Sequence, residues 1–340
     1  MDTFIAPTDR ADLLRTAVTQ AVDFLREGEV VALPSETVYG LAADALNPAA
    51  VARIFEAKER PSFDPLIVHL PHRKRLADVA IVPPEIAETV ALLIEKFWPG
   101  PLTLVLPKAD ALPESVTGGL STVAVRMSSH PVFKAVVTSF GGPLAAPSAN
   151  RFGRVSPTTA QHVCDEFGTA VLVLDGGPCA VGIESSIVDC TRGQPVLLRP
   201  GVLTRAQLEA ACGERVLSKD EADQRLLGSA SPRAPGTLAS HYAPSAKVRL
   251  MDAKAIQTAL DLLGSDAAHI AVYARSIVRI KSEKVLYRRM PDDALAAAQQ
   301  LFAVLRDFDA QGVKLIWVEN LPNAGEWDGV RDRLMRAAAT

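Results

Sequence analysis

The sequence contains few aromatic residues, which account for 5% of its 340 positions. Its core must therefore be built mostly from alanine, valine, leucine and isoleucine. Hydrophobic residues make up 48% of the chain and charged residues 22%, proportions that are typical of a globular protein with a well-filled interior. A chain of this length is expected to form about two domains of ordinary size.

Cysteine is also scarce. The four cysteines are far apart in the sequence, and no two of them form a C-x-x-C pair: Cys164, Cys179, Cys190 and Cys212. This spacing argues against a structural zinc site and against a disulfide framework. The sequence therefore predicts free thiols in a cytoplasmic protein.

Long apolar runs and an excess of basic residues are absent as well. No stretch of about 18 uncharged apolar residues occurs, so no membrane span is predicted. The charged N-terminal segment lacks the apolar core of a signal peptide. The formal net charge of −3 argues against a protein whose main task is to grip a nucleic-acid backbone, although local basic patches stay open.

Four widespread functional motifs are missing too. The sequence has no phosphate-binding G-x-x-x-x-G-K-[ST], no dinucleotide-binding G-x-G-x-x-G, no H-E-x-x-H and no G-x-S-x-G. A nucleotide bound by this chain would therefore be held by another arrangement of residues, and no covalent nucleophile is indicated.

The sequence does contain a regular alternation of strand and helix patterns. Asp9–Arg26 has apolar residues at helical spacing, and Asn47-Pro48 is a typical helix start. We predict a mixed α/β domain with a large sheet over residues 1–212. A polar stretch rich in Ser, Pro and Gly predicts a linker over 213–244. Strands alternating with helices over 245–340 predict a smaller, mostly parallel α/β domain.

Two cations end the second predicted helix. Lys58 and Arg60 lie in "AKERP", directly before Pro61. Cations at a helix C-terminus can simply complement the helix dipole. A lysine and an arginine can equally grip phosphate groups, the first as a point charge and the second as a planar fork. Both interpretations stay open from these residues alone.

An arginine and a histidine lie within predicted strands. Arg126 in "STVAVRM" shares a strand face with Thr122 and Ala124, and it needs either an anionic partner or water. His69 lies near the end of "PLIVHL". Pro71 separates it from the next histidine, and no further ligand supports a metal site, so we interpret His69 as a hydrogen-bonding side chain.

Three apolar runs end in clusters of hydroxyl, amide and carboxylate groups: "VALPSETVYG", "LAAPSANRFG" and "GIESSIVD". Each cluster alone could be an ordinary turn with Asx and Ser hydrogen bonds. Because several such segments occur in one domain, we predict that they share a polar ligand site.

Together these stretches resemble the threonylcarbamoyl-AMP synthase family in its long form, which has a YrdC-like catalytic domain and an extra C-terminal domain. The matching motifs occur in family order: "PSETVYGLAADA", "KERPSFDPLIVHL", "FWPGPLTLVL", "VAVRMSSHP", "APSANRFGRVSPT", "GIESSIVD", "LLRPG" and "HYAP". The resemblance implies a YrdC-like mixed twisted sheet with helices around an open cleft, followed by a small Rossmann-like α/β domain.

Members of this family make L-threonylcarbamoyl-AMP and pyrophosphate from L-threonine, bicarbonate and ATP. The product feeds a downstream transferase complex that modifies the adenosine next to the anticodon in certain tRNAs. The resemblance therefore implies a nucleotidyltransferase with ATP as a substrate and Mg²⁺ as its expected companion, without a metal site built from protein ligands. No membrane partner is implied, and direct contact with tRNA is left open.

The resemblance also assigns individual residues. Lys58 and Arg60 match the K-x-R pair that holds the triphosphate, and we expect them to act in catalysis. Further ATP contacts are expected from Thr103, Ser148, Asn150, Arg199 and Tyr242. Contacts to threonine are expected from Thr37, His69, Arg126 and Ser186.

The linker departs from the family pattern, because "APGTLAS" stands before "HYAP" where many relatives have a more basic stretch. Tyr242 has two interpretations: it touches the nucleotide as part of a lid, or it pins the C-terminal domain against the first domain. Two other functions also stay open. One is an RNA-binding YrdC-like module without catalysis, against which the net charge counts. The other is a carbamoyl-phosphate-dependent transferase, whose family carries zinc fingers that this chain lacks.

Overall fold

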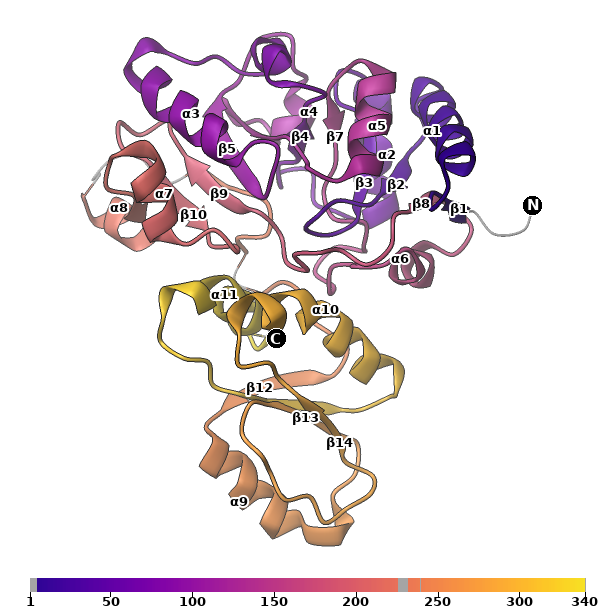
Figure 1. Cartoon of the computed structure of the whole chain (residues 1–340), viewed down its shortest axis with the longest axis vertical. Helices are drawn as coiled ribbons and strands as arrows, with labels where there is room; N and C mark the ends of the chain where they lie inside the picture. The colour runs from indigo at the N-terminus through magenta and orange to yellow at the C-terminus, as the bar shows by residue number, and fades with distance from the viewer. Residues whose placement is uncertain (1–4, 226–231, 239, 340) are drawn as a thin grey trace. The chain divides into compact units, whose positions relative to one another are not determined.

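The computed structural model describes residues 5–225, 232–238 and 240–339, and these residues form two compact units. The first unit contains the chain up to Phe152 together with Ser156–Thr237. The second contains Gly153–Val155 and the chain from Leu238 onward. Figure 1 shows both units.

The first unit is built on one mixed sheet of eleven strands among its described residues. The strands are β1 Ile5–Pro7, β2 Val31–Leu33, β3 Gly40–Asp44, β4 Ile67–His69, β5 Leu102–Pro107, β6 Thr122–Arg126, β7 Leu144–Ala145, β8 Leu172–Asp175, β9 Ser186–Asp189, β10 Val196–Arg199 and β11 Leu217–Ser218. Their order is β1-β8-β2-β3-β7-β4-β6-β5-β9-β10-β11. In the centre, β6 is parallel to β4 and antiparallel to β5, so the predicted mixed sheet is confirmed.

Helices cover both faces of this sheet (Figure 1). They are α1 Ala11–Arg26, α2 Pro48–Lys58, α3 Pro84–Phe97, α4 Glu114–Thr117, α5 Pro131–Phe140, α6 Ala160–Phe167, α7 Arg205–Cys212 and α8 Lys219–Arg225, with a 3-10 turn η1 Arg73–Asp78. The helix predicted to open at Asn47-Pro48 is confirmed. The Asn47 side chain accepts hydrogen bonds from the backbone N–H groups of Ala49 and Ala50, and Pro48 occupies the first turn.

The alternation of strand side chains sets the two layers of the core. In β2, Val31 and Leu33 pack with α1 and α5, whereas Ala32 between them faces the opposite cluster. That second cluster includes Ile54 of α2 and Leu93 of α3. The apolar strand residues thus hold helices on both faces and leave the strand ends to the polar segments.

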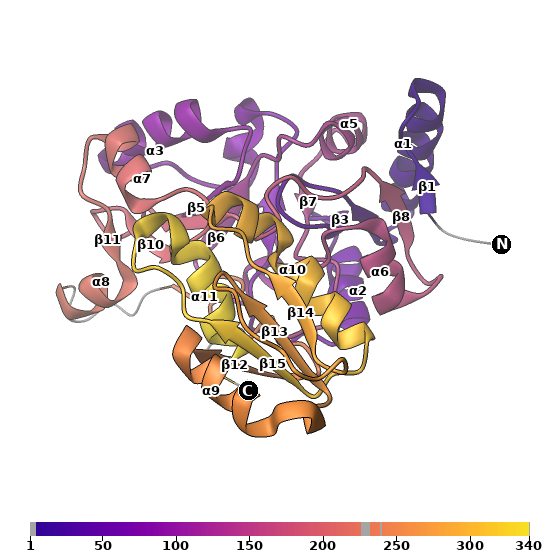
Figure 2. The ribbon, with the colours of Figure 1, turned by 60° about the horizontal axis from the view of Figure 1, so that its bottom comes forward.

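The second unit has a parallel four-stranded sheet in the order β12-β15-β13-β14. The strands are β12 Lys247–Met251, β13 Ile270–Ala274, β14 Leu286–Arg289 and β15 Leu315–Glu319. The helices are α9 Ala253–Leu263, α10 Ala294–Ala310 and α11 Asp328–Ala337, with 3-10 turns η2 Gly264–Asp266 and η3 Gly325–Trp327. Helix α9 lies on one face of the sheet, and α10 and α11 lie on the other (Figures 1 and 2). This confirms the small parallel α/β fold.

The segment predicted as a linker, 213–244, contains more regular structure than its composition indicates. Strand β11 and helix α8 lie within it, and Ala222 and Ala234 are buried against β9 and β10 side chains. The two compact units divide between Thr237 and Leu238, and residues 226–231 and 239 lie outside the described part. A few small apolar residues are sufficient to dock a segment that is polar on average.

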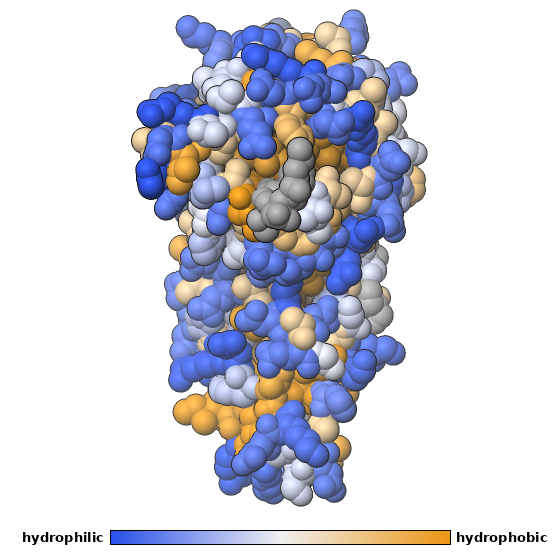
Figure 3. All heavy atoms as spheres, turned by 90° about the vertical axis from the view of Figure 1, so that its right-hand side faces the viewer, coloured by the Kyte–Doolittle hydropathy of each residue, from blue (hydrophilic) through white to orange (hydrophobic). Residues whose placement is uncertain are grey.

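The face in Figure 3 is largely hydrophilic, with apolar side chains gathered in a few places. Within the described residues, none of the helices has the length and apolar character that crossing a membrane requires.

Candidate active site

The "PSET" segment after β2 is a tightly hydrogen-bonded turn. The Ser35 hydroxyl accepts hydrogen bonds from the N–H groups of Thr37 and Val38, each at 3.2 Å, and donates one to the Val38 carbonyl at 2.6 Å. The Val181 N–H donates to the Glu36 carbonyl at 2.8 Å. The turn is therefore fixed on both sides, with Glu36 and Thr37 buried.

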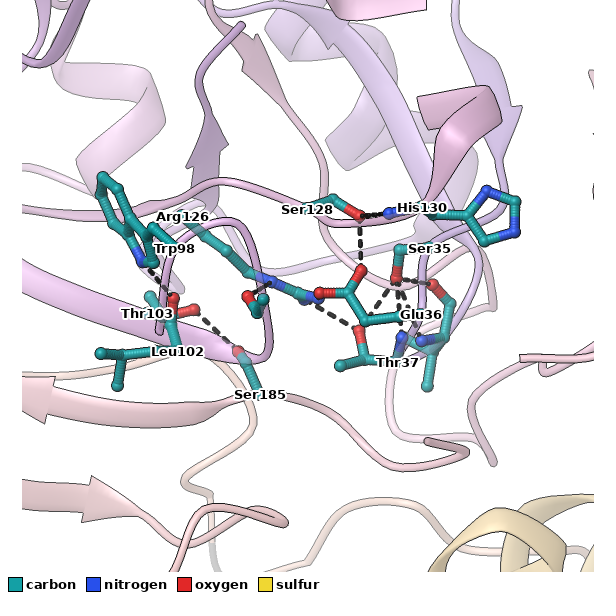
Figure 4. A network of polar contacts seen from close by, with 12 residues as sticks. Ser35, Glu36, Thr37, Trp98, Leu102, Thr103, Arg126, Ser128, His130 and Ser185 are labelled. Atoms are coloured by element: carbon teal, nitrogen blue, oxygen red, sulfur yellow. Dashed lines mark hydrogen bonds and ion pairs between the residues drawn. The ribbon is translucent and has the colours of Figure 1, made fainter. Parts of the chain in front are cut away.

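Arg126 ends β6 and reaches this turn (Figure 4). Its Nη1 donates to the Thr37 hydroxyl at 2.8 Å, and its Nε donates to the Gly100 carbonyl at 3.2 Å. Its Nη2 lies 2.7 Å from Oε1 of Glu36. Arg126 is only 3% exposed, so the interpretation of an arginine that faces water is wrong, and the alternative of an anionic partner is confirmed.

Glu36 supplies that partner, and sequence reasoning did not single it out. Ser128 donates to Oε2 of Glu36 at 2.5 Å. Burial would raise the pKa of the Glu36 carboxyl, but the Arg126 guanidinium and the Ser128 hydroxyl outweigh burial and lower it to about 2. Glu36 is therefore a carboxylate at neutral pH. The available signal was the position of Glu36 between Ser35 and Thr37, at a strand end full of hydroxyl groups.

His69 ends β4, and its Cα is paired in register with that of Arg126 on the neighbouring strand. The ring is buried and lies 4.5 Å from the Phe133 ring, measured between centroids. Burial, with help from the Arg126 charge, lowers the pKa of His69 to about 3, so the imidazole is neutral at pH 7. Its Nδ1 has no hydrogen-bond partner among the described residues, and the predicted hydrogen bond of this side chain stays a prediction.

A second polar group links β5, β9 and β10. The hydroxyl oxygens of Thr103 and Ser185 lie 2.7 Å apart, and Arg199 donates to the Ser185 hydroxyl at 3.2 Å and to its carbonyl at 3.0 Å. The Ser186 hydroxyl donates to the Leu203 carbonyl at 3.1 Å. A Cβ on Gly201 would come within 2.6 Å of the Ser186 nitrogen, which explains why glycine follows "LLRP". Ser185 is a further polar residue that the sequence interpretation missed.

Lys58 at the end of α2 is buried, with 1% of its surface exposed. Its ammonium donates to the Ser148 carbonyl at 2.6 Å and also to the Asn150 carbonyl. Burial lowers the pKa of Lys58 well below its ordinary value, and the nearby Arg60 adds to the effect. Lys58 thus binds the backbone of the "SAN" segment and is not a solvated cation at a helix end.

Arg60 is held by the residues that follow it. Its Nη2 lies 2.9 Å from the Asp64 carboxylate and donates to the Pro65 carbonyl at 2.8 Å, while the guanidinium lies over the Phe152 ring. Burial raises the pKa of Asp64, and four cations oppose the rise: Arg60, Lys58, Arg199 and Arg233. These cations therefore share one electrostatic environment. In the same region the Asn150 amide donates to the Arg151 carbonyl at 2.7 Å.

Two family models match this chain. A family model described as "Telomere recombination" matches residues 23–201, and one described as "Threonylcarbamoyl-AMP synthase, C-terminal domain" matches residues 203–339. A threonylcarbamoyl-AMP synthase of Bacillus subtilis is 40% identical over 98% of this chain and 96% of its own length. One of Pyrococcus abyssi is 39% identical over 94% and 93%.

The chain belongs to the threonylcarbamoyl-AMP synthase family. Its predicted membership in the long form of that family is confirmed, because the two family models together span both compact units. The crystal structure of P. abyssi Sua5 complexed with L-threonine has a TM-score of 0.85 to this chain at 37% identity. It covers 99% of this chain and 98% of that one. The fold predicted from the resemblance is confirmed by this match.

In this chain, most of the predicted site residues lie in the first unit. They are Thr37, Lys58, Arg60, His69, Thr103, Arg126, Ser148, Asn150, Ser186 and Arg199. A chain of neighbours joins three of them: Arg126 pairs in register with Thr103, Thr103 meets Ser185, and Ser185 binds Arg199. In the described residues, no group of three or more His, Cys, Asp and Glu side chains is placed to hold a metal ion.

Tyr242 lies in the second unit, unlike the other predicted site residues. Its ring stacks on Phe302 of α10 at 5.5 Å and lies 5.2 Å below the Arg333 guanidinium of α11. The side chain is 1% exposed, and its backbone has a φ of 60°, which is uncommon for a residue other than glycine. These contacts all lie within the second unit. The pinning of that unit against the first and the nucleotide contact both stay predictions.

Proposed function

We propose that this chain catalyses the formation of L-threonylcarbamoyl-AMP and pyrophosphate from L-threonine, bicarbonate and ATP. The supporting observation is the buried group formed by Glu36, Thr37 and Arg126, which offers a cation, an anion and a hydroxyl at one strand end. Family membership supports the same reaction, since the related proteins are named for its product.

The threonine half of the proposed site comprises Thr37, His69, Arg126 and Ser186. Arg126 would bind the substrate carboxylate, because a guanidinium matches a carboxylate with two parallel donors. Thr37 would meet the substrate hydroxyl, and neutral His69 would offer its Nδ1 as a hydrogen-bonding atom. The P. abyssi relative was solved with L-threonine bound, which supports an amino-acid site in this fold.

The nucleotide half comprises Lys58, Arg60, Thr103, Ser148, Asn150, Arg199 and Tyr242. Lys58 and Arg60 would stabilise charge on the phosphates as pyrophosphate leaves, which is the main contribution of a protein to such a transfer. Magnesium prefers to keep water and substrate phosphates as ligands. This preference fits the lack of a metal-ligand cluster among the described residues, and Mg²⁺ would then reach the site with ATP.

The chemistry needs no enzyme nucleophile. The threonine amine adds to CO₂, or to bicarbonate with loss of water, and gives a carbamate. A carbamate oxygen then forms a bond to the α-phosphorus, while the bond from that phosphorus to the bridging oxygen breaks and pyrophosphate departs. The residues of this chain would orient the two reactants and exclude water from the short-lived carbamate.

We assign the remaining roles as part of the same proposal. Residues 1–212 would carry catalysis, 213–244 would form the connection that closes over the site, and 245–340 would hold that connection. The product would pass to a downstream transferase that modifies tRNA, and the enzyme would act in the cytoplasm. A P. abyssi Sua5 structure carries alanines in place of a histidine and the tyrosine after it, and this chain has one such His-Tyr pair, His241-Tyr242.

Mass spectrometry of the purified protein with ATP, threonine and bicarbonate tests the proposal directly. We expect a threonylcarbamoyl-AMP peak and one pyrophosphate for each product molecule, both lost when threonine is left out. Product formation only with carbamoyl phosphate would favour a carbamoyl transferase. RNA binding without any adenylate product would favour a binding module.

A further inference from the structure

The ion pair between Glu36 and Arg126 is close but poorly aligned. Oε1 of Glu36 and Nη2 of Arg126 lie 2.7 Å apart. Nevertheless neither atom completes a hydrogen bond, with the other or with any described residue. Both side chains are more than nine-tenths buried, at 7% and 3% exposure. Buried charged atoms normally satisfy their hydrogen bonds, so a vacant donor beside a vacant acceptor calls for an explanation.

The other atoms of the two side chains are firmly held. Oε2 of Glu36 receives the Ser128 hydroxyl, which in turn accepts the His130 N–H at 3.2 Å. Nη1 and Nε of Arg126 are bound to Thr37 and Gly100. Figure 4 shows the carboxylate and the guanidinium facing each other from the turn and from the end of β6. Oε1 and Nη2 are the two polar atoms of these side chains that have no hydrogen-bond partner in the described structure, and the other contacts fix their direction.

An α-amino acid presents the matching pattern. Its carboxylate accepts hydrogen bonds and its amino group donates them, and one carbon separates the two groups. We infer that Glu36 binds the α-amino group of the amino acid whose carboxylate binds Arg126, so that the pair recognises both ends of the substrate. This inference rests on the proposed function, because it takes Arg126 as the carboxylate site, and it adds a residue that reads the amine.

The charge balance supports a zwitterionic ligand. Glu36 and Arg126 cancel each other, and His69 beside them is neutral at pH 7 because burial lowers its pKa. A ligand with one positive and one negative group would leave this balance unchanged. A ligand with a carboxylate alone would add an uncompensated negative charge next to Glu36, and a buried charge without a partner is costly.

The test compares binding of L-threonine with its α-hydroxy analogue, 2,3-dihydroxybutanoate of the same configuration, by calorimetry on the full-length protein. The wild type should bind threonine about 10- to 100-fold more tightly than the analogue, as is typical of one hydrogen bond to a charged group. Glu36→Gln should weaken threonine binding by a similar factor. It should also reduce the preference for threonine over the analogue to a few-fold or less. Glu214→Gln, at a carboxylate that accepts the Thr89 hydroxyl, is the matched control and should keep the full preference.

The outcomes separate this inference from the proposed function. A wild type that binds neither compound overturns both. A wild type that binds the two compounds equally well, or a folded Glu36→Gln protein that keeps the full preference, overturns only the role of Glu36. Should Glu36→Gln fail to fold, Ser128→Ala replaces it. That variant keeps the carboxylate but releases its Oε2, and an unchanged preference in it would also contradict the inference.

Discussion

Arg126 and Lys58 are both buried cations of the first unit, yet they meet very different partners. Arg126 is surrounded by side chains, and one of its nitrogens keeps hydrogen-bonding capacity. Lys58 donates to two backbone carbonyls of the "SAN" segment, and Arg60 is paired with Asp64. The proposed amino-acid half therefore keeps hydrogen-bonding capacity in the described structure. The cations of the proposed phosphate half are bound to the protein itself and would have to exchange partners to bind phosphates.

The first way to sharpen this contrast is to change the amino acid. A site that hydrogen-bonds the substrate hydroxyl should prefer L-threonine over 2-aminobutyrate by up to about 10⁴-fold in kcat/KM, since the analogue lacks the hydroxyl that Thr37 is proposed to bind. Product formation is measured by mass spectrometry. Serine is the control, because it keeps the hydroxyl and should lose only about 10- to 200-fold. Equal rates with threonine and 2-aminobutyrate would mean that Thr37 does not read the hydroxyl.

The second test addresses the phosphate half. Lys58→Met should lower kcat by about 10²- to 10³-fold, the usual effect of removing one charge-stabilising group. It should also destabilise the protein by about 1–3 kcal/mol, because the Ser148 and Asn150 carbonyls lose their donor. A lysine that only complements a helix dipole would instead contribute about 0.3–1 kcal/mol. Turnover and urea unfolding are measured on the same sample. Normal turnover in a folded variant would leave Lys58 with a structural role.

The third test uses acid to break the amino-acid half. His69 has a folded-state pKa of about 3, below its ordinary 6.5, so the unfolded chain takes up the proton first. The contribution of neutral His69 to the free energy of unfolding should therefore be complete above pH 6.5. This contribution should fall as the pH drops toward 3, by about 1.4 kcal/mol for each pH unit. Urea unfolding at several pH values measures the slope, and His69→Gln should flatten it.

Loss of the Glu36 charge should also lower the stability in acid, but over a lower pH range than His69. Its pKa is lowered from 4.5 to about 2, so its contribution to stability is present above pH 4.5 and is lost as pH approaches 2. A His69→Gln protein should therefore still lose stability below pH 4.5. An unchanged slope between pH 6.5 and 4.5 in that variant would show that another group is responsible for it.

The smallest effect is expected at Asp64. Its carboxylate occupies Arg60 and places a negative charge near the proposed phosphate position. Asp64→Asn should tighten ATP binding on the order of tenfold, which corresponds to one pKa unit of electrostatic interaction. ATP titration by calorimetry measures it, with threonine affinity as the control that should stay constant. Weaker ATP binding would mean that Asp64 orients Arg60 for the phosphates and does not compete with them.

The fold was largely predictable because it rests on local patterns. Alternating apolar residues and helix starts such as Asn47-Pro48 specify elements without long-range information. Strand β11 and helix α8 were missed because "GERVLSKDEADQR" is polar on average, and only a few of its side chains dock. Composition reports the mean of a segment, whereas docking depends on single side chains such as Ala222.

The candidate site was predictable in its residues but not in their partners. Motif resemblance pointed to Arg126 and Lys58 by position. That Arg126 is paired with Glu36, while Lys58 is bound to carbonyls, depends on contacts between segments 90 residues apart in each case. No periodicity within either segment encodes such a contact. Tyr242 illustrates the same limit, since its ring partners Phe302 and Arg333 come from helices far downstream.

One short piece of chain gives the two units a second covalent connection. Gly153–Val155 belongs to the second unit although the residues on both sides belong to the first. The Gly153 carbonyl accepts the Ala243 N–H at 2.9 Å, and Arg306 donates to the Val155 carbonyl. A cut after Thr237 would therefore leave a tripeptide without its hydrogen-bonding partners. Gly153 also lies three residues after Asn150. A force on the second unit would therefore act on the "SAN" segment directly through the backbone.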